Sequence, residues 1–343
     1  MLVRDICSFE YILTNSEMES LLLELNLIKK HFDFSPNNII KELDLKNINY
    51  NDLIKYDGIG KVKAIELIAE AGFDAIDCSM FDLGDGRILV SSTDMLHETT
   101  DFPKGMTEFE MGWMSVAVTL SDIASTGAAP SQVLVAVGLD NPERLYPFME
   151  GAVYCAEKFG TKVAGGDIDS HKELTAVTTA FGIVDQSVYC RRSGASVGDA
   201  VCVTGIPGRA QAALDGREEF REFLLTPTPQ VSSGQKIAHA GASSMMDVSD
   251  GVVISLYDIA DASSVGIVLD GKSFPLFEES EYAKTCFLYG GGDFGLLFTA
   301  SDAVLEKLDI DYTVIGRVVE GNSVILDGVV LPRKGYAHVW GDA

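Results

Sequence analysis

The sequence has no long hydrophobic run. No stretch approaches the roughly 18 consecutive apolar residues that a transmembrane helix needs. The first residues, Met1 to Asp5, also lack the basic region and apolar core of a secretory signal peptide. From these two absences we expect a cytoplasmic protein without membrane partners.

Basic residues are scarce. The 343 residues include 26 lysines and arginines against 51 aspartates and glutamates, a formal net charge of −25 at pH 7. Because an acidic surface repels phosphates, the chain as a whole is not expected to bind nucleic acid nonspecifically. Two interpretations remain open: a solvated acidic surface, and carboxylates gathered to hold the divalent cations that would bridge to an anionic nucleotide.

Several common site types are absent. The six cysteines are scattered and form no C-x-x-C pair, which favours buried thiols over a zinc site. The sequence contains no G-x-x-x-x-G-K-[ST] loop and no convincing G-x-G-x-x-G after a strand. His97, His171, His239 and His338 have no nucleophile elbow nearby, so Ser-His-Asp hydrolysis has little support.

Residues 1–70 form a segment of different texture, with short amphipathic helices and Asn-rich joints. Within it, residues 49–71 resemble a helix-hairpin-helix, and the region resembles the N-terminal part of RadC-like proteins. Lys61, Lys63 and the amides of the second helix would be available to a phosphate. However, the segment has 8 basic and 12 acidic residues, so DNA binding is the less favoured interpretation and a packing appendage the alternative.

The next segment contains strands and Asp-Gly turns. Asp74 to Asp94 predicts two strands joined by a hairpin at Asp85-Gly86. The strand pattern of residues 87–90 gives way to hydroxyls, carboxylates and an imidazole in residues 91–103. Polar groups that follow a strand lie at the rim of a sheet, where α/β folds keep their sites. A surface loop with ordinary turn chemistry is the alternative.

A long, nearly all-apolar helix is predicted at residues 108–126, with Gly127 as its end. Asp122 lies near the C-terminal end of this helix, where a carboxylate is electrostatically unfavourable. Among apolar neighbours such an acid needs a hydrogen-bonding partner or a cation. A solvated position on the helix surface is the alternative.

The first half continues with a central strand at 132–139, a helix at 142–159 and a strand at 175–184. Between them, residues 162–167 predict a buried strand that runs into a tight Gly-Gly-Asp turn. Such a turn would leave its carboxylate, that of Asp167, open to the close approach of a ligand.

The second half repeats this alternation, beginning with a strand at 200–204. Asp247 and Asp250 bracket Ser249 just before a helix at 252–262, and Gly290 to Gly295 form a glycine-rich turn before a strand at 296–299. Residues 249 and 250 suit helix capping, which is the plain interpretation. They equally suit a helix N-terminus that receives phosphate and an acid that binds metal. The chain therefore predicts two similar α/β lobes.

The order of these motifs resembles one family. The chain from about Asp77 to Trp340 looks like thiamine-monophosphate kinase, of the aminoimidazole-ribonucleotide-synthetase-like (PurM-like) superfamily. Each motif is short, but many occur in the right order. They are Ile76-Asp77-Cys78, Ser92-Thr93-Asp94, Val118 to Ala124, Gly127 to Pro130, Gly165-Gly166-Asp167, Arg192 to Ala195, Gly198-Asp199, Asp247 to Gly251, Gly290-Gly291 and Lys334 to His338.

The resemblance implies a two-lobed PurM-like α/β fold with mixed sheets flanked by helices, preceded by a small all-α extension. The implied domains are residues 1–70, 71–188 and 189–343. It also implies a homodimer that binds ATP and several magnesium ions and passes the γ-phosphoryl group directly to thiamine phosphate.

Site residues follow from the resemblance, motif by motif. The implied magnesium ligands are Asp77, Ser92, Thr93, Asp94, Asp122, Asp167, Asp247 and Asp250. The implied nucleotide contacts are Gly166, Asp167, Arg192 and Ser249. The implied acceptor side comprises His97, Asp101 and Asp293, with Asp101 standing where some members carry a substrate-binding histidine.

The sequence departs from the family mainly on the acceptor side. Gly292 and Gly295 replace two acids of the family's Gly-Gly-Glu-Asp-Tyr-Glu. Thr226 and Gln230 replace the arginines of its R-P-x-P-R, and Arg333 replaces a frequent aromatic. One of the two acids in the family's first Gly-Asp-Asp motif is missing as well.

Other activities remain as alternatives. The first is a PurM-like paralogue that phosphorylates a different small molecule. The second is a non-catalytic nucleotide- or DNA-associated protein that uses the hairpin of residues 49–71. A selenophosphate synthetase would need a reactive cysteine in a glycine-rich loop, and the hydrogenase-maturation member ends in a cysteine that this chain lacks.

Overall fold

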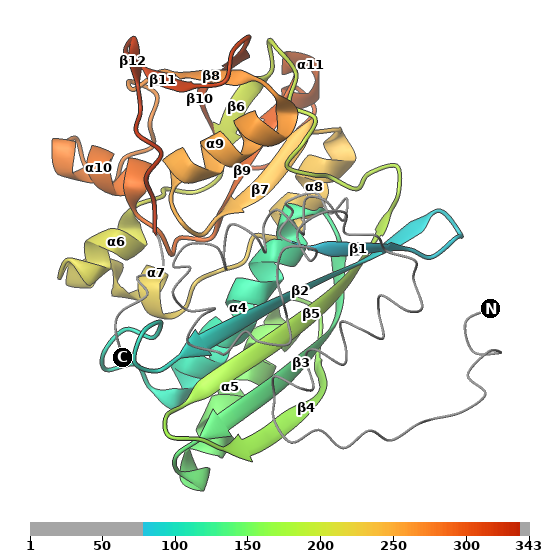
Figure 1. Cartoon of the computed structure of the whole chain (residues 1–343), viewed down its shortest axis with the longest axis vertical. Coiled ribbons are helices and arrows are strands. Elements are labelled where there is room, and N and C mark those ends of the chain that lie inside the picture. Colours follow the sequence, from blue (N-terminus) through green and yellow to red (C-terminus); the bar gives the residue numbers. More distant parts are fainter. Residues whose placement is uncertain (1–77, 337–343) are drawn as a thin grey trace, which may run out of the picture. The chain divides into compact units, whose positions relative to one another are not determined.

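The computed structural model of the chain describes residues 78–336, which contain two β-sheets with helices packed on them (Figure 1). The predicted arrangement of two lobes with mixed sheets flanked by helices is confirmed. The predicted helices of residues 1–70, the hairpin of residues 49–71 and Asp77 lie outside the described residues. The domain boundaries at residues 70 and 188 stay predictions. No helix among the described residues is long and apolar enough to cross a membrane.

The first sheet has the strand order β1-β2-β5-β3-β4. Only β3 and β4 run parallel, and the other neighbouring pairs are antiparallel. The predicted hairpin joins β1 to β2. The bounds are Ser79–Asp82 for β1, Arg87–His97 for β2, Ala129–Leu139 for β3, Val163–Ser170 for β4 and Thr175–Asp185 for β5.

Strand β2 is longer than its apolar pattern indicates. The prediction of a polar segment that leaves the sheet after Val90 is wrong, because the strand continues through Asp94 to His97. Its partner β5 is equally long, and the ladder runs without interruption from Arg87↔Asp185 to His97↔Thr175. Since the backbone of a strand is satisfied by its neighbour whatever its side chains are, polar residues extend a strand when the partner is present.

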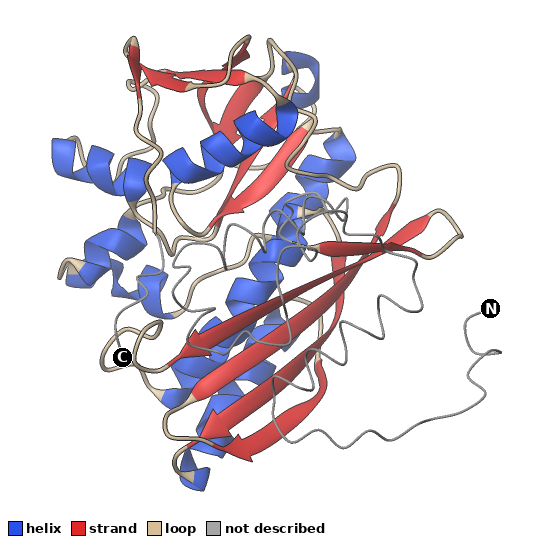
Figure 2. Cartoon of the chain, viewed as in Figure 1, coloured by secondary structure: helices blue, strands red, loops and turns tan. Residues whose placement is uncertain are grey.

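Helix α4, Glu108–Ser125, fulfils the prediction for residues 108–126 and begins with a capping box between Thr107 and Glu110. Helix α5, Leu145–Lys158, follows the short 3-10 helix η1, Pro142–Arg144, and both fall within the predicted helix of residues 142–159. Figure 2 shows α4 and α5 on one face of the first sheet. We call this the inner face and the opposite one the outer face.

Strand β4 corrects a second prediction. Residues 162–167 were expected as a buried strand ending in a tight turn, but β4 is the edge strand and its residues from Ala164 to Ser170 are exposed. Gly166 and Asp167 lie inside the strand, opposite Val135 and Ala136 of β3. The glycines therefore place backbone, rather than a turn, at the edge of the sheet.

The second sheet has the order β12-β11-β8-β10-β6-β9-β7 and one parallel pair, β8 with β11. Strands β6, β9 and β7 are buried along their whole length, which is consistent with their mostly apolar residues. The bounds are Ala200–Val203 for β6, Ser244–Val248 for β7, Gly266–Leu269 for β8, Gly295–Ala300 for β9, Thr313–Val319 for β10, Val324–Leu326 for β11 and Val329–Val330 for β12.

Helices cover the second sheet on both faces. Residues of α8 pack with Met245 and Phe298 on one face, and residues of α9 and α10 pack with Met246 and Leu297 on the other. The bounds are Arg209–Leu214 for α6, Glu218–Phe220 for the 3-10 helix η2, Arg221–Leu225 for α7, Val231–Ala240 for α8, Val252–Ser263 for α9, Glu281–Tyr289 for α10 and Asp302–Leu305 for α11.

The two halves meet where α4 passes α8. A Cβ atom at Gly234 of α8 would lie 2.1 Å from the carbonyl oxygen of Ala124 in α4, so only glycine permits this approach. Helix α4 also contacts β7, where the Ser121 hydroxyl donates to Asp247 at 2.7 Å. This packing brings carboxylates of both halves together.

Candidate active site

Three carboxylates from three elements form the centre of the site: Asp94 of β2, Asp122 of α4 and Asp247 of β7. Asp94 is on the inner face of the first sheet, toward α4. The Ser92 hydroxyl, also inward, donates to Asp122 at 2.5 Å. Asp247, which is 1% exposed, accepts from Ser121. Sequence reasoning had named all three acids and Ser92, and the structure brings them together.

We call Asp94, Asp122 and Asp247 the acid cluster. Its surroundings disfavour the ionised form of each carboxyl group. Burial raises the pKa of Asp94, and burial raises that of Asp247 to about 6. Burial also raises the pKa of Asp122 well above its usual range, and the charges of Asp247 and Asp94 add to the effect. Oδ2 of Asp94 is buried and has no hydrogen-bond partner. Like charges gathered in this way call for a cation.

Cys78 lies beside the acid cluster. Its thiol is 1% exposed, and burial raises its pKa well above the usual value, with further contributions from Asp122, Asp247 and Asp94. The thiol is therefore kept protonated and unreactive. The sequence predicted a buried thiol, but it did not indicate that Cys78 lies beside the acid cluster.

Asp250 and Ser249 do not cap the helix that follows them. The N-cap of α9 is Gly251, at φ 114°, so the capping interpretation does not hold. Asp250 is exposed, and its charge acts on Asp122 and Asp247. The Ser249 carbonyl accepts the Gly292 N–H at 2.8 Å, which seats the glycine turn of residues 290–292 against Asp250.

Asp167 and Thr93 do not join the acid cluster within one chain. Asp94 of β2 is in register with Thr178 of β5, which is in register with Val135 of β3. Asp167 of β4 pairs with the next residue of β3, Ala136. Because side chains alternate between faces, Asp94 points inward and Asp167 outward. Thr93 also points outward, where its hydroxyl lies 3.0 Å from that of Thr179. The expectation of a single metal shell that includes Asp167 and Thr93 is not met by one chain.

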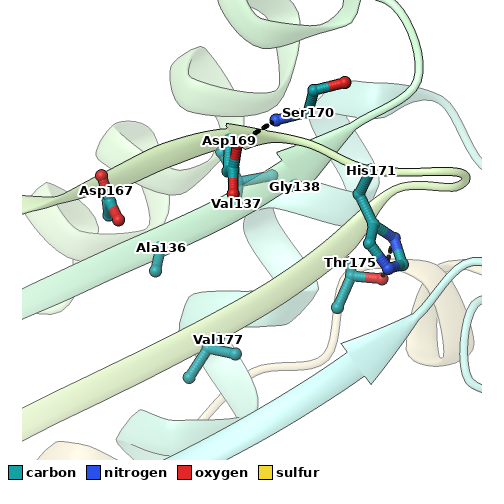
Figure 3. A pocket seen from close by; sticks show the side chains of 9 residues that line it. All are labelled: Ala136, Val137, Gly138, Asp167, Asp169, Ser170, His171, Thr175 and Val177. Carbon is teal, nitrogen blue, oxygen red and sulfur yellow. Dashed lines mark hydrogen bonds between the residues drawn. The ribbon is translucent and has the colours of Figure 1, made fainter. Parts of the chain in front are cut away.

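A pocket opens on this outer face (Figure 3). It has a volume of about 160 Å³. The His171 ring lies 3.1 Å from the Glu173 carbonyl and 3.3 Å from the Thr175 hydroxyl. Its lining comprises Ala136, Val137, Gly138, Asp167, Asp169, Ser170, His171, Thr175 and Val177.

Arg192 lies at the border of the acid cluster. Its guanidinium is 19% exposed and 3.8 Å from Asp258 of α9. Its positive charge lowers the pKa of Asp247 and so opposes the effect of burial. The predicted nucleotide contact is thus within electrostatic range of the predicted metal ligands.

The predicted acceptor residues are only partly brought together. Asp101 closes the turn after β2 by accepting the His97 backbone N–H at 2.8 Å. The His97 ring points outward instead, 3.1 Å from the Thr175 hydroxyl and 3.9 Å from Glu173. Tyr336 lies near Asp101 and Asp250, whose charges raise the pKa of its phenol beyond the effect of burial.

Asp293 has a structural partner. Its two carboxylate oxygens accept the backbone N–H groups of Gly208 at 2.7 Å and Ala210 at 3.0 Å, at the start of α6. Burial raises the pKa of this carboxyl to about 6. The carboxylate thus anchors α6, and its assignment to the acceptor stays a prediction.

Arg144 is a residue that sequence reasoning missed. It forms a bidentate pair with Glu98, at 2.8 Å to each oxygen, and also binds Glu108 at 3.0 Å and Asp140 at 2.9 Å. Glu98 and Glu108 are the two ends of the segment that carries Asp101. No local sequence pattern links Arg144 to Glu98 or Glu108, because these residues are far apart in the chain.

The described carboxylates are suitable for magnesium that also binds a nucleotide. Within residues 78–336, no three His, Cys, Asp or Glu side chains are arranged to hold a metal by themselves. Magnesium in phosphoryl-transfer sites keeps several waters and takes one or two carboxylates plus substrate phosphates. The carboxylate chemistry and the unpartnered oxygen of Asp94 fit this requirement.

Comparison with known proteins gives consistent matches. The family described as AIR synthase related protein, N-terminal domain, matches residues 75–184, and its C-terminal domain matches residues 197–328. The chain is 50% identical over 266 residues to a thiamine-monophosphate kinase of Methanospirillum hungatei, covering 77% of this chain and 93% of the relative. It is 40% identical over 264 residues to one of Archaeoglobus fulgidus, covering 74% and 86%.

Solved structures agree. The structure of AaThiL complexed with AMPPCP and TMP has a TM-score of 0.74 and 26% identity, covering 82% of this chain and 97% of that one. The hydrogenase maturation protein HypE of E. coli, at 21% identity and a TM-score of 0.60, covers 80% of this chain and 99% of its own and shares the fold.

Proposed function

The chain belongs to the thiamine-monophosphate kinase family, and on this premise we propose that it transfers the γ-phosphoryl group of ATP to thiamine phosphate. The observation that carries the proposal is the acid cluster of Asp94, Asp122 and Asp247. A cluster of carboxylates, in which Oδ2 of Asp94 has no hydrogen-bond partner, can hold the cations that a phosphoryl transfer uses to neutralise charge.

The reaction needs no covalent intermediate with the protein. A phosphate oxygen of thiamine phosphate attacks the γ-phosphorus of ATP, and the bond from that phosphorus to the β,γ-bridging oxygen breaks. The products are thiamine diphosphate and ADP. Such a transfer depends on positioning and charge neutralisation rather than on a protein nucleophile.

We assign the magnesium-binding role to Asp94, Asp122 and Asp247, with Asp250 at the exposed border. Bound magnesium would supply positive charge to the triphosphate in addition to that of Arg192. Ser92 and Ser121 orient two of these carboxylates through hydrogen bonds. Loss of the Ser121 hydroxyl is therefore expected to weaken metal binding without removing a predicted ligand.

The nucleotide is assigned to Arg192, Ser249 and the border of the acid cluster. Arg192 offers a guanidinium that is held near Asp258 and remains partly exposed. A planar guanidinium can bind two phosphate oxygens at once. Support for ATP as the donor comes from the AMPPCP in the structure of the related AaThiL.

We further propose a homodimer that packs through the outer face. Within the described residues no helix covers this face, and Met95 on it is 57% exposed. Val177 and Ala136, which are in register with Met95 on β5 and β3, are half-buried. An apolar patch of this kind marks an interaction surface. Dimerisation there would enclose Asp167 and the pocket between the first sheets of the two protomers.

The direct test is a screen of phosphate acceptors with ATP and magnesium, read by mass spectrometry. Thiamine phosphate should give thiamine diphosphate and an equal amount of ADP, and Asp94→Asn should abolish both. Tight nucleotide binding with transfer to another acceptor would identify a paralogue with a different substrate. Nucleotide binding without any transfer, together with salt-sensitive DNA binding lost in Lys61→Glu, would support the non-catalytic alternative.

A further inference from the structure

Arg209, the first residue of α6, differs from other arginines of the second half because no carboxylate pairs with it. Arg217 and Arg333 form ion pairs of 2.7 and 2.6 Å. Arg317, on β10, pairs with Asp302 at 2.8 Å. None of the ion pairs formed by the described part of the chain includes Arg209.

The guanidinium of Arg209 is nevertheless held in place. Its central carbon lies 3.5 Å from the centroid of the Phe223 ring, and Nε donates to the Ile206 carbonyl at 3.1 Å. The side chain is half-buried, and this burial lowers its pKa. Neither contact uses the two terminal nitrogens. A guanidinium fixed by stacking and through Nε presents those nitrogens as a ready fork for two oxygens.

The neighbouring acid, Asp293, forms no ion pair with this charge. Asp293 is electrostatically coupled to Arg209, yet its oxygens are taken by the N–H groups of Gly208 and Ala210. At position 292 the chain has glycine. A Cβ there would lie 3.4 Å from the Cβ of Ala210, so an acid at this position would stand beside α6. Arg209 is thus a half-buried cation that still lacks an anion.

Arg209 lies between the glycine turn and the segment after β2. On one side, Gly292 bonds to Ser249, the neighbour of Asp250. On the other, Leu225 of α7 belongs to the same apolar cluster as Phe102 and Met106. Figure 1 shows α7 next to the loop that follows β2. This is the side on which Asp101 lies, whereas Arg192 lies against Asp247 and Asp258.

We propose that Arg209 binds the phosphate group of the acceptor, a phosphate monoester, and so contributes to acceptor selection. This assignment rests on the proposed function. The terminal nitrogens supply a bidentate contact, Phe223 fixes their plane, and Gly292 leaves them without a competing carboxylate. Arg209 thereby supplies a positive charge on a side of the site where Thr226 and Gln230 are uncharged.

Steady-state kinetics of the full chain test the assignment. Arg209→Gln should raise the KM for thiamine phosphate roughly 10-fold, the effect of one charge-assisted hydrogen-bonding group, and leave the KM for ATP within about twofold. Arg209→Lys, which keeps the charge but not the fork, should give an intermediate KM. Arg317→Gln removes another partly exposed arginine and should change neither constant. An unchanged KM for thiamine phosphate in Arg209→Gln would overturn the proposal.

Binding of thiamine, which has no phosphate, separates recognition from folding. Arg209→Gln should bind thiamine as the unaltered chain does but lose most of its preference for thiamine phosphate, measured by calorimetry. Equal losses for both ligands would show a merely structural role and reject the proposal. If the unaltered chain does not phosphorylate thiamine phosphate, the proposed function fails. Arg209 is then judged with inorganic phosphate, which should protect the unaltered chain, but not Arg209→Gln, from thermal unfolding.

Discussion

Arg144 and Glu98 form a bidentate ion pair that fixes one end of the segment carrying Asp101. Both guanidinium–carboxylate contacts measure 2.8 Å, and the Arg144 side chain is 15% exposed. Glu98 also accepts the Leu174 N–H at 3.0 Å, and Arg144 holds its pKa below the usual range. Since Arg144 also binds Glu108, one side chain ties together both ends of residues 98–108.

Loss of this connection should affect the acceptor more than the nucleotide. Arg144→Ala is expected to destabilise the chain by about 2 kcal/mol, because partly buried carboxylates lose charge-assisted hydrogen bonds. The KM for thiamine phosphate should rise while that for ATP changes little. Urea unfolding and steady-state kinetics measure the two effects. Arg317→Ala, which breaks an exposed pair, is the control and should cost less than about 1 kcal/mol.

Asp122→Asn should separate activity from stability. Removing one of several mutually repelling buried carboxylates should maintain or raise the melting temperature in chelator, while turnover falls by about two orders of magnitude or more. Asp302→Asn, at an exposed surface position, should leave turnover unchanged. Calorimetry in chelator and a coupled ADP assay report the two quantities. A large loss of stability in Asp122→Asn would show that the acid is a structural group rather than a cation ligand.

The acid cluster also predicts an unusual pH dependence. Asp247 has a pKa raised to about 6 in the folded state, against 3.8 for the ordinary group. The folded chain therefore binds this proton more tightly than the unfolded chain, so its contribution to stability is lost as pH rises from about 4 to 6. In chelator, Asp247→Asn should remove this part of the pH slope between pH 4 and 6.5. An identical slope in both proteins would contradict the assignment.

Added magnesium should oppose the same trend. A cation that binds the ionised carboxylates stabilises the folded state most where they have lost their protons. The melting temperature should therefore rise more on magnesium addition at pH 7 than at pH 5. Asp247→Asn should reduce this difference, and sodium at matched ionic strength controls for screening.

The outer face predicts the oligomeric state. Met95→Asp places a charge in the centre of the apolar patch and should shift the chain toward the monomer in sedimentation equilibrium. Val197→Asp is matched to it, because Val197 is 59% exposed but lies in the second half. It should leave the mass unchanged. A dimer that persists in Met95→Asp would place the interface elsewhere.

Much of the fold was accessible from local patterns. The apolar run of residues 108–126 predicted α4, and the Asp-Gly pair at residues 85–86 predicted the hairpin. Both elements depend on residues that are close together in the sequence, so local patterns predict them. The extent of β2 was not accessible, since its polar residues stay in the sheet only because β5 pairs with them along their whole length.

By itself, the sequence determined which acids the protein carries and where each stands along its element. Asp122, late in an apolar helix, was identifiable because burying a carboxylate is costly. Asp94 was identifiable because Ser92-Thr93-Asp94 follows a strand pattern and matches a motif of the family. Only the tertiary structure decided which of these acids meet. Strand register turned Asp94 inward and Asp167 outward, and the packing of α4 against α8 brought Asp247 to Asp122. Such contacts depend on residues far apart in the chain, so no local pattern contains them.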